Sequence, residues 1–309
     1  MKKLLLASSA LVASAGVASA DVSLSGSAEM GLVGGTSTDA QFHQDVDVTF
    51  SMSGTTDGGL EFGTAVDLDE DAGSVGTDDA GVAAFISGAF GTLTLGDTDG
   101  GFDWAMSEVP GGSGSLADDE TEHDGYNSNS GLDGTHDGQI ARYDHAFGDF
   151  AFALSAEVDD GDVKDPIVGI GVKYSADMGG NTLGFGVGYQ TGETAAGNEA
   201  SVVGVSVSYA IDALSVGLNY SVQEQDDWTE DQTHMGIGVS YSMDALTFGA
   251  NYGVFDNVGG NDGDEKTGFG LSAGYDLGGG ASILAGYGSS DPVSGSDTDS
   301  WSLGLAMSF

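Results

Sequence analysis

The chain is built from short segments in which apolar and polar residues alternate. Between Val22 and Leu32 the even positions are apolar or small, and the odd positions are Ser, Glu or Gly. The same period of two runs through Phe42 to Met52 and Leu60 to Leu68. Successive side chains of a β-strand point to opposite faces, so this pattern predicts strands with one apolar face. We therefore expect an all-β fold.

The second half of the chain repeats one hairpin. Similar strand motifs end at Tyr174, Tyr209, Tyr241 and Tyr275, spaced by 35, 32 and 34 residues. After each, a short turn leads into a strand that ends near a second tyrosine; these are Tyr189, Tyr220, Tyr252 and Tyr287. Tyrosine at both rims of an outward face is typical of aromatic girdles at two membrane interfaces.

The alternating segments give seven strands up to Val158, eight in the four repeated hairpins and one final strand. This count predicts a transmembrane antiparallel 16-stranded β-barrel, with short turns on one side and long, acidic loops on the other. A repeat of this period also occurs in propellers and solenoids. A β-sandwich would account for the alternation, but not for tyrosine at both rims or for alternating loop lengths. In the barrel, the Leu, Val, Phe and Tyr face is outside. The later strands carry mostly Gly or Ser inside, which favours an open channel.

Two features suggest export to a cation-rich setting. Residues 1–20 read as a signal peptide, with Lys2 and Lys3 before an apolar run and Ala18-Ser19-Ala20 at the cleavage site, which leaves 21–309 as the barrel. A membrane-anchoring helix is the alternative. The chain has 49 acidic and 6 basic residues, a net charge of -43, which excludes nucleic acid as a partner and concentrates cations. Solubility in a salty medium would also explain this charge.

One long segment, from Asp97 to Asp137, holds eleven carboxylates and no Lys or Arg. We call it the acidic loop. Long structureless loops are uncommon in compact folds and are often functional. We expect this loop to fold into the lumen and form a constriction, mostly because of a resemblance to a known family. An outward-facing flap is the alternative. The predicted constriction residues are Asp97, Asp99, Asp103, Glu108, Asp118, Asp119, Glu120 and Arg142, and the predicted pore-wall residues are Glu29, Asp45, Asp47 and Glu61.

Several segments carry a resemblance to a known family. Phe90 to Gly96, Glu108 to Gly112, Ile140 to Asp144 and the terminal Phe309 resemble the corresponding parts of the general diffusion porins of Gram-negative outer membranes. The resemblance implies a homotrimer, contact with outer-membrane lipid and lipopolysaccharide, and passive diffusion of small hydrophilic solutes.

In that family the third loop faces a basic cluster on the wall, and Arg142 is the one position here that matches such a residue. A salt bridge at the rim is the alternative role for Arg142. Asp97 stands where the family often has a basic residue. Acid on both sides of the constriction predicts a preference for cations.

Other chemistries have less support in the sequence. Asp97, Asp99 and Asp103 could supply oxygen ligands to calcium, but the full calcium-loop pattern is absent, and a diffuse cation cloud is the alternative. We expect no required cofactor. With no cysteine and no zinc spacing among the five histidines, we predict that the chain is not an enzyme. The alternative functions are a substrate-specific outer-membrane channel and an acidic surface adhesin or calcium-binding barrel.

Overall fold

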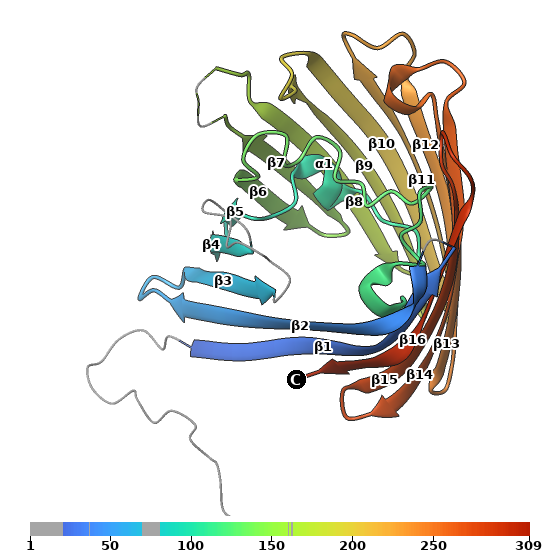
Figure 1. Ribbon diagram of the computed structural model, residues 1–309. Coiled ribbons are helices and arrows are strands. Elements are labelled where there is room, and N and C mark those ends of the chain that lie inside the picture. Colours follow the sequence, from blue (N-terminus) through green and yellow to red (C-terminus); the bar gives the residue numbers. More distant parts are fainter. Residues whose placement is uncertain (1–20, 37, 70–80, 160, 162) are drawn as a thin grey trace, which may run out of the picture.

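A computed structural model describes residues 21–36, 38–69, 81–159, 161 and 163–309, so the predicted signal peptide lies outside the described residues. Within these residues, sixteen strands form a closed antiparallel barrel in sequence order, with β1 paired to β16 (Figure 1). The predicted fold class is confirmed. The strands are β1 Asp21–Gly35, β2 Thr38–Thr55, β3 Glu61–Asp69, β4 Val82–Gly88, β5 Gly91–Gly96, β6 Ile140–Phe147, β7 Phe150–Glu157, β8 Ile167–Asp177, β9 Asn181–Glu193, β10 Glu199–Ile211, β11 Leu214–Gln225, β12 Gln232–Met243, β13 Leu246–Asp256, β14 Glu265–Gly278, β15 Ala281–Asp291 and β16 Thr298–Ser308.

The outer face of the barrel is apolar and exposed. Residues of one parity, such as Ile170 and Val172 on β8 and Val203 and Val205 on β10, lie open on this face. A continuous exposed apolar surface of this size is unfavourable in water and is typical of contact with lipid. The tyrosines of the two predicted rows lie on the same face, one row near the turns and one near the loops. No helix among the described residues is long and apolar enough to cross a membrane.

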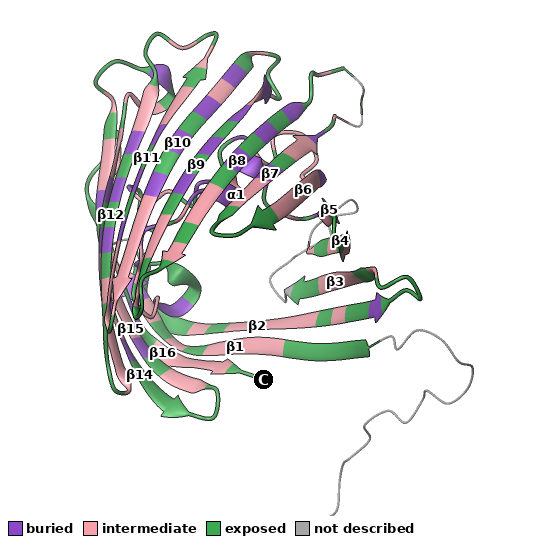
Figure 2. Cartoon of the chain, turned by 180° about the vertical axis from the view of Figure 1, so that it is seen from behind, coloured by how far each residue is buried: buried purple, intermediate pink, exposed green. Residues whose placement is uncertain are grey.

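The buried core of the protein lies inside the barrel. The acidic loop joins β5 to β6 and contains a helix α1 (Gly101–Ala105) and a 3-10 turn η1 (Leu116–Asp118). A cluster of buried side chains joins this loop to β8 and β10, and its members are Phe102, Met106, Leu132, Ile167, Ala200 and Val202. Figure 2 shows the matching pattern: buried positions alternate along β8 to β12, whereas β1 to β3 are mostly intermediate or exposed.

Candidate functional site

The acidic loop rests directly on the backbone of the wall at α1. A Cβ atom added at Gly171 would collide with Gly101 O, and one at Gly186 with Ala105 O. A Cβ at Gly188 would lie 2.8 Å from Phe102 O. Only glycine allows two backbones to approach so closely. These inward glycines therefore do more than leave room in the lumen, because they form the surface on which the loop lies.

Polar side chains of the wall hold the loop through its backbone. Ser206 Oγ accepts a hydrogen bond from Ser107 N at 2.9 Å, and Asn251 Nδ2 donates to Thr121 O at 2.8 Å. Ser272 Oγ donates to Gly111 O at 2.5 Å. Further wall groups that bind loop backbone are Ser155, Gln190, Asn219, His234, Ser290 and Ser302. Because the wall binds backbone atoms, the loop side chains on the other side are free to meet solvent.

The return limb of the loop is held by a buried carboxylate that sequence reasoning missed. Glu157, which is 1% exposed, accepts hydrogen bonds from the backbone N–H groups of Gly134, His136 and Gly138 at 3.1, 2.9 and 2.9 Å. Such donors satisfy a buried charge. The alternating pattern contained the signal, since the neighbours of Glu157 face outward and Glu157 must therefore face inward.

The tip of the loop is fastened to the first and last strands. Leu116 is 0% exposed and fills a notch where Gly31 of β1 pairs with Gly304 of β16. A Cβ at either glycine would stand 2.5 or 2.6 Å from Leu116 Cδ1. Next to it, Glu29 Oε2 accepts a hydrogen bond from Ala117 N at 2.8 Å. The predicted wall residue Glu29 therefore also binds the loop.

Most of the predicted loop carboxylates lie on the side of the loop away from the wall. Asp99, Glu108, Asp118 and Asp119 are exposed. Glu122 and Asp124 are exposed as well, while the residues between and beside them are buried, so this extended stretch also directs its acids away from the wall. Although both side chains reach solvent, partial desolvation by the surrounding loop, followed by the charge of Asp118, raises the pKa of Glu122, and partial desolvation raises the pKa of Asp119.

Two predicted constriction residues lie elsewhere. Glu120 is fully buried between loop and wall, where Ser302 Oγ donates to its Oε2 at 2.5 Å and burial raises its pKa. The placement of Glu120 at the opening was wrong. Asp97 is exposed just after the end of β5, and its carboxylate accepts a hydrogen bond from Gly81 N at 2.8 Å. Asp97 therefore ties the start of the loop to the segment before β4.

Arg142 faces the lumen and binds the start of the loop. Its Nη1 donates to Asp99 O at 2.8 Å, and its Nε donates to Asp144 Oδ1 at 3.3 Å. Close by, burial followed by the charges of Asp99, Asp133 and Glu108 raises the pKa of Asp103 to about 7. The pKa of Asp133 rises to about 6, mainly through burial. These groups carry charge that changes near neutral pH.

The opposite wall, on β1 to β3, is acidic. Asp47 Oδ2 accepts a hydrogen bond from Ser27 Oγ at 3.0 Å, and Asp45 is half-buried two residues before it. The predicted Glu61 is exposed at the turn end of β3. Asp67, which was not predicted, accepts a hydrogen bond from Thr49 Oγ1 at 3.0 Å. His43 Nε2 lies 3.5 Å from Glu29 Oε2, which places one imidazole among these acids.

The three carboxylates proposed from the sequence as calcium ligands do not form one site. In the described part of the chain, no group of three or more His, Cys, Asp or Glu side chains has the arrangement needed to hold a metal ion. Asp97 turns toward Gly81, Asp99 toward Arg142, and Asp103 is half-buried within α1. The geometry therefore does not support a calcium site built from these residues.

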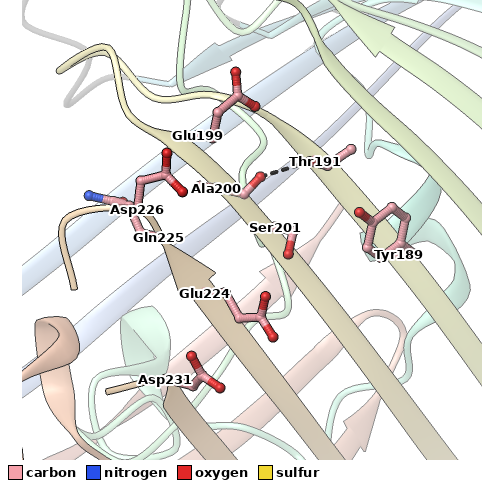
Figure 3. Close-up of a pocket in the computed structure, with 9 residues that line it drawn as sticks. All are labelled: Tyr189, Thr191, Glu199, Ala200, Ser201, Glu224, Gln225, Asp226 and Asp231. Carbon is pink, nitrogen blue, oxygen red and sulfur yellow. Dashed lines mark hydrogen bonds between the residues drawn. The ribbon is translucent and has the colours of Figure 1, made fainter. Parts of the chain in front are cut away.

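A second acidic surface lies outside the lumen. Figure 3 shows a pocket at the loop ends of β9 to β11, with Glu199, Glu224, Asp226 and Asp231 among its lining residues. Tyr189 also lines it and belongs to the exposed tyrosine row near the loops. Register pairs Ser201 with Glu224, and both share the outward parity of the exposed Val203. This pocket is therefore separate from the loop and the inner wall.

The family is decided by comparison with known sequences. A family model described as Gram-negative porin matches residues 7–294. The chain belongs to the Gram-negative porin family. This membership confirms the expected family and places the porin in the outer membrane of a Gram-negative bacterium. It also confirms the prediction that the porin is not an enzyme, because the family consists of channels.

Individual relatives agree with this assignment. A porin from Rhodobacter capsulatus is 32% identical over 171 residues, which cover 54% of this chain and 55% of the relative, so the match spans about half of its length. A porin structure refined at 1.8 Å resolution is similar with a TM-score of 0.76 and 26% identity, covering 94% of this chain and 100% of that one. A triple mutant of the Rhodopseudomonas blastica porin, with a TM-score of 0.65, 20% identity and the same coverage, shows the same fold.

Proposed function

We propose that this porin is a passive diffusion channel for small hydrophilic solutes and that it prefers cations to anions. The single observation that carries the preference is the distribution of exposed acids. The acidic loop turns Asp99, Glu108, Asp118 and Asp119 away from the part of the inner wall on which it lies. We call this part of the wall the seat of the loop. Rings of carboxylates favour cations in a pore because they lower the energy of a cation and raise that of an anion.

The inner wall adds to this charge. Asp45, Asp47 and Glu29 lie on β1 and β2, and the positive groups described near the loop start are Arg142 and Lys173. Two unit charges about 4 Å apart interact with about 4 kcal/mol at an effective dielectric constant near 20, and with about 1 kcal/mol in water. Even the smaller value, summed over several carboxylates, is enough to discriminate between potassium and chloride.

We infer in addition that the porin assembles as a homotrimer, as the resemblance to general diffusion porins implies. Residues 21–96, which form β1 to β5, contain no Tyr or Trp, whereas the strands from β8 to β15 carry both tyrosine rows. Tyr and Trp are enriched where a protein surface meets the lipid interface. An arc without them supports contact with another protein surface. Contact with lipopolysaccharide stays a prediction of the resemblance.

The test is the zero-current potential of the purified porin in a planar bilayer under a potassium chloride gradient. We expect stepwise conductance and a potential near the potassium equilibrium value. A potential near zero or near the chloride value would contradict the preference while leaving the channel intact. Currents that saturate with one solute would favour a substrate-specific channel instead. Failure to conduct would contradict the channel itself and favour an adhesin.

A further inference from the structure

Lys173 is a basic side chain of the lumen without an acidic partner among the described residues. Lys173 lies on β8 with the same inward parity as Gly169 and Gly171, both of which touch the loop. Its Nζ stands 4.2 Å from the centroid of the Trp104 ring, which belongs to α1. Within the described residues, no ion pair within 4.0 Å joins Lys173 to a carboxylate. The ammonium group is thus held by an aromatic face.

Arg142 differs from Lys173 in this respect. Its guanidinium donates to Asp99 O and to Asp144 Oδ1 and forms ion pairs with the carboxylates of Asp99 and Asp144, so its charge has acidic partners on the loop and on its own strand. The ring of Trp104 attracts the ammonium of Lys173 through its quadrupole but accepts no conventional hydrogen bond from it. A lysine ammonium has three donors. Lys173 therefore retains donors that can bind a solute.

The contact with Trp104, which belongs to α1, places the ammonium of Lys173 beside the start of the acidic loop. Its side chain is half-buried, so part of it remains open to solvent. We propose that Lys173 is the anion-contact residue of the constriction, and that it binds small carboxylates and the carboxylate end of zwitterions as they pass. This proposal rests on the channel function and deepens it by naming a substrate class.

Trp104 has a positioning role in this proposal. Its ring holds the ammonium at a distance from Asp99 and Asp103, which would otherwise pair with it. Loss of the ring frees the flexible lysine side chain to form such a pair, and a paired ammonium offers fewer donors to a passing anion. The structure therefore links an aromatic residue of the loop to the anion permeability of the pore.

The chain supplies a matched control for Lys173. Lys266 on β14 stands over Phe255 with its Nζ 4.3 Å from the ring centroid, so it is also a lysine held by an aromatic face. It pairs in register with Phe255 near the loop ends of β13 and β14, away from α1. Lys173→Gln and Lys266→Gln remove the same charge from the same kind of contact, a lysine over an aromatic ring, at two different positions in the barrel.

The experiment measures the permeabilities of chloride and acetate relative to potassium from zero-current potentials in planar bilayers. We expect Lys173→Gln to lower both ratios roughly two- to fivefold, and Lys266→Gln to change them less than roughly 1.5-fold, because screening limits the reach of a charge to about a Debye length. Lys173→Arg should retain the wild-type ratios. Trp104→Leu should lower both ratios in the wild type and have no further effect in the Lys173→Gln background.

Equal shifts for Lys173→Gln and Lys266→Gln would overturn the proposal, as would a loss in Lys173→Arg as large as that in Lys173→Gln. Each variant is compared with the wild type by ratio, so the result does not depend on which ion the wild-type channel prefers. An anion-preferring wild type would contradict the proposed cation preference alone. Heat-resistant barrel structure in each variant, measured by circular dichroism, shows that the comparison is between folded channels.

Discussion

Two arcs of the inner wall have the same alternating sequence pattern but different roles. One arc holds the acidic loop, and the other stays open and carries acidic side chains. The strands from β8 to β16 present glycine, serine and amide side chains, and the acidic loop lies on them, backbone against backbone. The strands β1 to β3 present Glu29, Asp45, Asp47 and Asp67, of which only Glu29 has a described hydrogen bond to the loop. Small side chains on the inner face of a barrel can therefore mark a surface on which a loop lies as well as an open channel.

The division explains how one loop can be both fixed and strongly charged. Its attachment uses backbone groups and a few buried side chains, which impose little on the residues between them. The exposed positions are consequently free to be acidic. The position of the loop and its charge are separate properties, and substitutions on each arc should affect one without the other.

The largest effect should come from filling the seat. Gly253→Val places a side chain where the Cβ position already collides with Gly125 O, a backbone atom that cannot turn aside. Overpacking of this kind costs about 1–3 kcal/mol, and the displaced loop should occupy the lumen. We expect a lower melting temperature and roughly a twofold or greater fall in single-channel conductance.

Ser51→Val on β2 is the matched control for this experiment. Ser51 is half-buried and faces inward on the open arc, so the added methyl groups meet water instead of the loop. Its conductance should stay close to the wild-type value. If Ser51→Val and Gly253→Val reduce conductance equally, the distinction between seat and open wall is wrong.

A smaller effect, on selectivity alone, is expected from the open arc. Asp45→Asn with Asp47→Asn removes two wall charges and should lower the potassium-to-chloride permeability ratio roughly three- to tenfold. Glu120→Gln removes a carboxyl group that is fully buried under the loop, and should leave the ratio nearly unchanged. Zero-current potentials measure both. An equal change in the two variants would show that the burial of Glu120 does not remove it from the ion path.

Acidification should weaken selectivity by about twofold between about pH 8 and about pH 5, since the pKa of Asp103 is about 7 and that of Asp133 is about 6. Both pKa values are raised, so the seated loop binds these protons more tightly than a solvated loop would. Acidification through this window therefore stabilises the seat while it removes charge. Asp103→Asn should abolish the part of the change centred near pH 7. A wild-type ratio independent of pH would contradict this.

The smallest effect is expected for Tyr126→Phe. The Tyr126 hydroxyl donates to Glu108 Oε2 at 2.6 Å, a contact made within the loop itself. Its loss should reduce stability by about 1 kcal/mol and increase open-channel current noise slightly, because Glu108 then moves more freely. Noise spectra at constant voltage measure this. A large fall in conductance would mean that Tyr126 helps to hold the loop on the wall.

The barrel was predictable from the sequence because its two faces meet different solvents. Lipid outside and water inside impose a strict period of two, and the tyrosines of the repeated hairpins mark both interfaces. No single period of this kind decides which side chains of the acidic loop are buried. Glu120 and Glu122 look alike in the sequence, yet one is buried against β16 and the other is exposed, since the turn at η1 and the wall decide their direction.

Lys173 shows the opposite case, in which the signal was present and was not used. Its parity with Gly169 and Gly171 places it inside as firmly as the parity of Arg142 does. What the sequence did not show was the contact with Trp104, which lies in a loop 69 positions earlier and meets Lys173 only in the folded barrel. Contacts between segments so far apart follow from the path of the loop.

The notch that receives Leu116 also has a consequence for the order of folding. Its two sides are Gly31 and Gly304, which belong to strands separated by almost the whole chain, and it exists only after these strands have paired. Docking of Leu116 is therefore a late step and follows cylinder closure. Contacts that form after the transition state leave the rate of barrel closure unchanged and slow its opening, in which β1 and β16 separate. The contact of Leu116 with this notch should therefore slow the separation of the first and last strands, and so slow unfolding of the barrel.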